Sequence, residues 1–311
     1  MGQYPISYQR RLLAYLLLGG LLPLLAASAM ILYAADRVYE NTQAKAGRAE
    51  VQRISREIDN LAGNYQRLMM PLLARGETIA FLRGERGDVE HIYGDLYAVL
   101  SGRSGEISIY LLSADGTQVI ATGDLPRAYR LPAHLQWGLI GQAAQAKEWV
   151  LLSADRYEAD QKDTVFSMAH AIRQGDELLG FAVVDVKREA LVPLIQRVQD
   201  GNEGQIILTD RYRYVMMDML DHHREGFSSL FSAIEDGASE SVFRDYAYAS
   251  SQTGIAVHLR QKMDSAPLDY LFRLVLMVDA VALCMTAYLA YRLSRHLWRP
   301  LHTLTTAMRH V

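Results

Sequence analysis

Apolar residues gather in two runs, one near each end of the chain, and a mixed polar and apolar stretch lies between them. The first run, 12–35, has no charged residue, and the second, 274–291, has only Asp279. A helix of about 20 residues crosses the hydrocarbon core of a bilayer. The pattern therefore predicts transmembrane helices over 12–35 and 271–291, which enclose a domain over 36–270.

Basic residues border these runs on the sides that face the two ends of the chain. Arg10 and Arg11 precede the first run, and Arg292, Arg295 and Arg299 follow the second. Since basic flanks favour the cytoplasmic side, we expect a cytoplasmic tail over 1–11, both termini in the cytoplasm and an extracytoplasmic domain. The chain is then a two-pass protein of the plasma (inner) membrane. A cleaved signal peptide is the alternative for the first run, although its apolar part is usually only ~7–15 residues long.

The charge inside the second run needs an explanation, because an ionised carboxylate within a membrane is costly. In one interpretation Asp279 is partly hydrated or protonated near the outer interface. In the other it meets a polar group on another span, such as Ser28 or Thr286 of a partner subunit. The second interpretation gives Asp279 a part in relaying a signal.

A regular apolar stripe follows the first run. Its members are spaced alternately three and four residues apart, which is typical of a helix with one apolar seam. They are Val51, Ile54, Ile58, Leu61, Tyr65, Leu68 and Leu72. The stripe predicts a long helix that either packs along a sheet or shares the seam between the domain core and a dimer partner.

Short strands replace the helical pattern from about residue 107. Apolar and alternating runs predict two cycles of strands, each interrupted by turn residues such as Ala114-Asp115-Gly116. The predicted strands are 107–112, 118–121, 164–172 and 180–186, then 205–209, 214–217, 241–249 and 254–260. An irregular segment at 124–163 and a linking helix at 191–198 complete the pattern. We expect an α/β domain with a larger lobe at about 76–190 and a smaller one at about 200–262.

The first strand cycle resembles a known family. Residues 109–116, Ile-Tyr-Leu-Leu-Ser-Ala-Asp-Gly, open it, and 178–186, Leu-Leu-Gly-Phe-Ala-Val-Val-Asp-Val, close it. This order, after a long helix and between two spans, resembles the double Cache (dCache) sensor domain of bacterial receptors. That family closes the lobe with a glycine, four small or apolar residues and an aspartate. The resemblance implies two PAS-like lobes and a small extracytoplasmic ligand in the larger, membrane-distal one.

The resemblance also implies ligand-binding positions in the larger lobe. The family takes its pocket wall from the segment before the third strand and from the closing aspartate. Here those positions are Trp137, Trp149, Arg156, Tyr157, Phe166, Met168 and Asp185. Amino-acid-sensing members carry an arginine, a tryptophan and a tyrosine close together, whereas residues 134–138 read His-Leu-Gln-Trp-Gly. The missing arginine and tyrosine argue against an α-amino acid as the ligand.

The C-terminal segment 292–311 is similar to the first helix of a HAMP linker, and no second helix of such a linker follows it. We therefore expect either a fragment of a longer receptor or a truncated gene product. The segment has a basic exit, the sequence Trp298-Arg299-Pro300-Leu301, and a second apolar stripe. The similarity implies a homodimer and a signal relay through Asp279, Pro300 and Leu301. The favoured interpretation is the sensor half of a histidine kinase in a two-component system. The alternatives are the sensor half of a chemoreceptor or diguanylate cyclase, or a membrane-tethered protein-binding domain with no small ligand.

The remaining chemistry indicates no enzyme and no cofactor. No catalytic constellation or phosphate-binding glycine loop stands out, and a net charge of −3 argues against nucleic acid as a partner. The single cysteine, Cys284, lies in the second run, so the outer domain has no disulfide. Asp218, Asp221, His222 and His223 are better explained by a surface loop than by a metal site, since adjacent histidines on a strand point to opposite faces.

Overall fold

A computed structural model describes residues 8–85, 88–103, 105–131, 135, 138–154, 163–199, 204–219, 243–262 and 266–308. The chain divides into two compact units. One, here called the paired-helix unit, is Met1–Ala44 with Asp264–Val311, and the other, the two-lobed unit, is Lys45–Met263. The apolar runs thus belong to one unit and the strand-rich stretch to the other.

Two long helices carry the apolar runs. They are α1 (Tyr8–Leu73) and α7 (Ala266–Met308). Within the described residues, the segments Leu18–Leu73 and Ala266–Arg292 are the two that are long and apolar enough to cross a membrane. Large apolar side chains such as Met30 and Met277 are exposed on them, at 74% and 67%. Exposed apolar surface of this kind is suited to lipid rather than to water.

The predicted apolar stripe of α1 is largely buried within the chain. Val51, Ile54 and Ile58 are at most 1% exposed, but Leu68 is 43% exposed. An α-helix has 3.6 residues per turn, so a strict heptad stripe drifts around it. Farther along, the buried face passes through Ala62, Tyr65, Met69 and Leu72. The packing alternative is therefore confirmed for most of the stripe, and Ile54 and Ile58 have no surface left for a partner.

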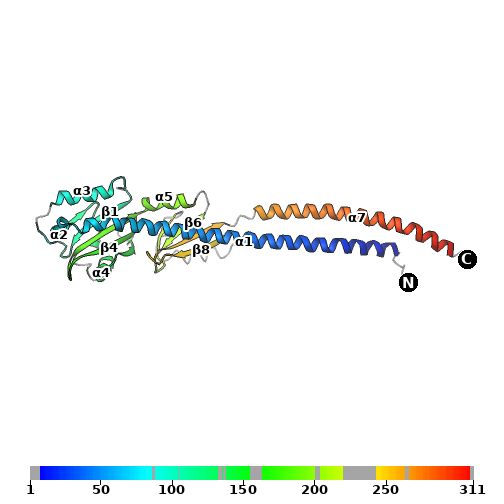
Figure 1. Cartoon of the computed structure of the whole chain (residues 1–311), viewed down its shortest axis with the longest axis horizontal. Coiled ribbons are helices and arrows are strands. Elements are labelled where there is room, and N and C mark those ends of the chain that lie inside the picture. The colour runs from blue at the N-terminus through cyan, green and yellow to red at the C-terminus, as the bar shows by residue number, and fades with distance from the viewer. Residues whose placement is uncertain are drawn as a thin grey trace. The chain divides into compact units, whose positions relative to one another are not determined.

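The larger lobe is built on a five-stranded antiparallel sheet (Figure 1). Its strands are β1 (Ile107–Ser113), β2 (Val119–Ala121), β3 (Val150–Ser153), β4 (Thr164–Gln174) and β5 (Glu177–Lys187), in the order β2-β1-β5-β4-β3. Every residue of β1 is buried, which shows that both faces of the sheet are covered. A strand buried on both faces reads as a continuous apolar run rather than an alternating one.

Helical segments lie around this sheet. They are α2 (Gly76–Leu82), α3 (Val89–Leu100), the 3₁₀ turn η1 (Arg127–Tyr129) and α4 (Gly138–Gln145). Tyr129 and the α4 residues Leu139, Ile140 and Ala143 share one core cluster with Phe181 of β5. The expectation that 124–163 is irregular is wrong in part, because this stretch contains η1, α4 and β3. These elements have only three to eight residues each, too few to display a period.

The smaller lobe follows through one linking helix, α5 (Arg188–Gln199). Its sheet has four antiparallel strands, in the order β7-β6-β9-β8. They are β6 (Gly204–Thr209), β7 (Val215–Asp218), β8 (Phe243–Ala249) and β9 (Ala256–Lys262). The predicted linking helix and the four predicted strands of the second cycle are confirmed to within a few residues.

Helix α1 contacts both lobes, as Figure 1 also shows. Its Gln66 side chain lies against Met168 of β4, with Nε2 3.9 Å from Sδ. Its Asp59 carboxylate accepts hydrogen bonds of 2.8 Å from Ser250 and Thr253, in the turn after β8. The two lobes therefore share α1 as a common support.

The sheet leaves no space for a side chain at Gly180. A Cβ atom there would lie 2.1 Å from the Leu112 carbonyl oxygen. Gly180→Ala should lower the free energy of unfolding by about 2–4 kcal/mol, because backbone must move. Gly94→Ala, in the exposed interior of α3 with nothing within 4 Å, should instead raise it by about 0.5–1 kcal/mol. Thermal unfolding of the two purified variants tests this, and equal shifts would contradict it.

Candidate functional site

Asp185 is a carboxylate buried inside the larger lobe. It is 1% exposed, and its neighbours across the sheet are Ser108 of β1 and Ser167 of β4. Paired residues of adjacent strands project to the same face. The register therefore gathers two hydroxyls and one carboxylate on the face that η1 and α4 cover.

Tyr129 reaches the same carboxylate from η1. Its hydroxyl donates to Asp185 Oδ1 at 2.5 Å, and Ser167 Oγ donates to the same oxygen at 2.6 Å. The two hydroxyl oxygens lie 2.8 Å apart. Hydrogen bonds to an ionised acceptor are short and strong, so this cluster fixes the position of Asp185.

Two tyrosines surround Asp185. Burial, reinforced by the Asp185 charge, raises the pKa of Tyr129 well above its ordinary value, and the same two causes raise the pKa of Tyr110. Both phenols therefore stay protonated donors at neutral pH. The ring centroids lie 5.3 Å apart, and the Tyr110 hydroxyl donates to the Asp124 carbonyl at 3.2 Å. The cluster thus combines two aromatic rings with a few oriented polar groups.

The predicted ligand-binding residues do not all lie on this face. Side chains alternate along a strand, and Ser167 of β4 shares the face of Asp185. Its neighbours Phe166 and Met168 therefore point to the opposite face, where Met168 meets Gln66 of α1. Both are fully buried. Their assignment to one pocket with Asp185 is wrong for this geometric reason.

Trp149 also lies away from Asp185. It stacks on His170 of β4, with ring centroids 5.3 Å apart and an interplanar angle of 23°. His170 alternates in phase with Met168, which places this stack on the opposite face. Burial lowers the pKa of His170. Trp137, Arg156 and Tyr157 lie outside the described residues.

Reasoning from sequence missed the hydroxyl partners of Asp185. Ser108 and Ser167 are polar residues inside strongly apolar strands, and each is at most 4% exposed. That break in an apolar run is the signal that could have drawn attention to them. Tyr129 gave no such signal, since it lies in an irregular segment 56 positions from Asp185.

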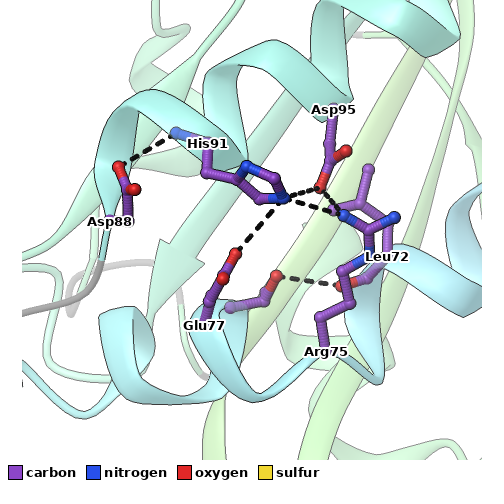
Figure 2. Close-up of polar contacts among 7 residues, drawn as sticks. Leu72, Arg75, Glu77, Asp88, His91 and Asp95 are labelled. Carbon is purple, nitrogen blue, oxygen red and sulfur yellow. Dashed lines mark hydrogen bonds and ion pairs between the residues drawn. The ribbon is translucent and has the colours of Figure 1, made fainter.

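A second polar cluster joins α2 to α3 at the surface of the larger lobe (Figure 2). His91 Nε2 lies 3.6 Å from Glu77 Oε2 and 3.9 Å from Asp95 Oδ2, and Arg75 pairs with Asp95. Asp88 caps α3 by accepting from the His91 backbone N–H at 3.2 Å. The cluster links α2 to α3, although exposed pairs of this kind contribute little stability each.

No metal site is found in the described part of the chain, where no group of three or more histidine, cysteine or acidic side chains could hold an ion. Asp218 is completely buried and accepts a hydrogen bond of 2.8 Å from Gln205 Nε2. The expectation of a surface loop is therefore wrong for Asp218. Residues 221–223, with the other members of that set, lie outside the described residues.

In the paired-helix unit, Asp279 of α7 meets a hydroxyl on α1. Ser28 Oγ donates to Asp279 Oδ1 at 2.7 Å. Asp279 thus meets a polar group on the other apolar helix, as one interpretation expected, but the group belongs to the same chain and not to a partner. Thr286 instead donates within its own helix, to the Ala282 carbonyl at 2.7 Å. Pro300 and Leu301 fall within α7, and their side chains lie outside the described part.

Comparison with known proteins settles what fold this is. No protein-family model and no curated protein matches the chain. Among solved structures, the ligand-binding domain of the Pseudomonas aeruginosa amino-acid chemoreceptor PctB, in complex with L-arginine, is similar with a TM-score of 0.55 and 16% identity. The match covers 73% of this chain and 97% of that one. The two-lobed unit has the double Cache fold.

Other double Cache-type structures support this assignment. The ligand-binding domain of the Pseudomonas fluorescens chemoreceptor CtaA, in complex with L-valine, has a TM-score of 0.53 and 12% identity over 72% of this chain and 98% of that one. The extracellular domain of a candidate histidine kinase has a TM-score of 0.50 and 12% identity over 71% and 93%. The neighbours are sensor domains, and at these identities they establish the fold alone.

The Tyr129 hydroxyl should matter for stability because it donates to a buried carboxylate. Tyr129→Phe should lower the free energy of unfolding by about 1.5–3 kcal/mol. Tyr212→Phe is the control, because Tyr212 is 60% exposed and its change should stay within about 0.5 kcal/mol. Thermal unfolding of the purified chain in detergent measures both. A Tyr129→Phe variant as stable as the control would show that this hydrogen bond is dispensable.

Proposed function

We propose that this chain is the sensor half of a transmembrane receptor, which binds a small ligand outside the cell membrane and relays a conformational change through α7. The observation that carries the proposal is a double Cache fold in a chain that also has two candidate membrane spans. The basic flanks of those spans favour termini in the cytoplasm. The two-lobed unit is then extracytoplasmic.

The ligand site that we propose is the sheet face around Asp185. A small-molecule pocket is mostly apolar, with a few placed polar groups. Tyr110, Tyr129, Ser167 and Asp185 supply such groups beside an apolar cluster that includes Phe181 and Val183. Trp137, Arg156 and Tyr157 stay in the proposal as residues of the adjoining segments. Trp149, Phe166 and Met168 are left out, because their side chains lie on the other face of the sheet.

The ligand class that we propose is a small molecule with an amino group. The two chemoreceptor domains described above were solved with L-arginine and L-valine, which both carry a primary ammonium. Here Asp185 is the group that can accept hydrogen bonds from an ammonium with charge assistance. Residues 134–138 lack the arginine and tyrosine that would clamp an α-carboxylate. We therefore favour amines over α-amino acids.

Titration of amines onto the full chain in nanodiscs tests this site. The panel is putrescine, GABA, L-valine and succinate, with heat of binding as the readout. Asp185→Asn should weaken the best amine by roughly tenfold or more, because a charge-assisted hydrogen bond is lost. Asp176→Asn, on the exposed β4–β5 turn, is the matched control and should leave affinity unchanged. Equal binding by wild type and Asp185→Asn, or binding of succinate alone, would rule the amine site out.

The output that we propose is a histidine kinase, reached through a HAMP-type helix at 292–311. Its support is the basic exit and the Pro300-Leu301 pair, which lie in the C-terminal part of α7 beyond the apolar run. Parallel helix bundles of this kind need at least two chains, so the receptor is a homodimer. The exposed side chains of Leu68 and Met70 on α1 offer it a further contact. A chemoreceptor is the second candidate, because PctB and CtaA are chemoreceptors.

The hydrogen bond between Ser28 and Asp279 is proposed to bias the signalling state. A ligand shifts an equilibrium between two helix arrangements only through its different affinity for them. Asp279→Leu removes a contact that holds one arrangement, so it should change basal output in the full-length receptor while ligand affinity stays the same. Ser28→Ala should act in the same direction. Met277→Leu, at an exposed position of the same helix, is the control. If Asp279→Leu has the same basal and stimulated output as the wild type, the Asp279 side chain has no role in signalling.

A further inference from the structure

A groove between α1 and α5 lies apart from the face of Asp185. Its volume is about 430 Å³, and its lining includes Arg53, Leu61 and Tyr65 of α1, Arg103 before β1, and Leu194 and Arg197 of α5. None of the residues assigned above to the ligand site lines it. The groove is large enough for a small organic molecule.

Three arginines from three separate segments give the groove an excess of positive charge. Arg53, Arg103 and Arg197 line it together with two acids, Glu57 and Glu106, so the balance is three positive against two negative. Within the described part of the chain, none of the three arginines makes an ion pair. Guanidinium groups are planar donors that match carboxylates with two parallel hydrogen bonds. An anion in the groove would be attracted by all three.

A buried hydroxyl faces the same groove. Tyr65 is 1% exposed, and its hydroxyl lies near Glu106 but makes no hydrogen bond of normal geometry. Burial, followed by the charge of Glu106, raises the pKa of Tyr65 to about 12. The phenol is therefore a protonated donor at neutral pH. A buried donor without a partner is costly, and a ligand oxygen would remove that cost.

One part of the groove wall is apolar. Leu61 of α1 and Pro193 and Leu194 of α5 contribute it. We propose that the groove binds a small organic anion, whose carboxylate groups are held by Arg53, Arg103, Arg197 and the Tyr65 hydroxyl while its carbon chain lies on the apolar wall. Since α5 joins the two lobes, this anion bridges α1 to the connection between them. The site does not depend on the receptor function proposed above.

Anion binding to the full chain in nanodiscs tests the proposal. The probes are succinate, citrate and inorganic phosphate, each compared with sodium chloride at the same ionic strength because exposed charges are screened by salt. Succinate or citrate should raise the thermal unfolding midpoint, since a ligand that binds only the folded state stabilises it. Arg103→Gln and Arg197→Gln should each weaken that binding roughly tenfold. Tyr65→Phe should weaken it by about three- to tenfold.

Arg56→Gln is the matched control. Arg56 is exposed on α1, three positions from Arg53, and does not line the groove. The Arg56→Gln variant should bind succinate and citrate as tightly as the wild type does. The proposal is overturned if sodium chloride gives the same stabilisation, or if Arg103→Gln and Arg197→Gln bind as well as Arg56→Gln. Binding of phosphate without either carboxylate would overturn the assignment to an organic anion.

Discussion

The larger lobe depends on one constraint, which is that β5 lies in the middle of its sheet and both faces of the strand are covered. From Leu179 to Val186 every residue of β5 is buried. Side-chain alternation then assigns each residue to one of two different environments. Asp185 falls on the face that η1 and α4 cover, where the hydroxyls of Tyr129 and Ser167 donate hydrogen bonds to it. A shift of one residue in register would turn this carboxylate to the opposite face of the sheet, where Met168 contacts Gln66 of α1.

Long apolar runs made most of the fold predictable. The strands β1, β4 and β5 are long, and turns with glycine at positive φ, such as Gly116 at 74° and Gly175 at 63°, separate them clearly. The elements that were missed are short. Strand β3 has four residues at the sheet edge, and α4 has eight after a glycine. Such elements are held by their contacts with the sheet, which no local pattern expresses.

The candidate site was less predictable than the fold, because it depends on register and on distant contacts. Asp185 was found from the motif that closes the lobe. Whether Phe166 or Ser167 shares its face depends on the pairing of β4 with β5, which includes an irregularity between Thr164 and Phe166. The sequence pattern does not reveal that irregularity. Tyr129 joins the site only once the segment after β2 has folded over the sheet.

The contact between Ser28 and Asp279 has a consequence for building hybrid proteins from this chain. The hydroxyl comes from the first apolar helix and the carboxylate from the second. Nearby, a Cβ at Gly20 would lie 3.0 Å from Thr286, so the same two helices are also fitted to each other in shape. The two apolar helices are therefore a matched pair. A chimera that takes one of them from another protein keeps a partly buried acid or a hydroxyl without its counterpart, so the pair should be exchanged together.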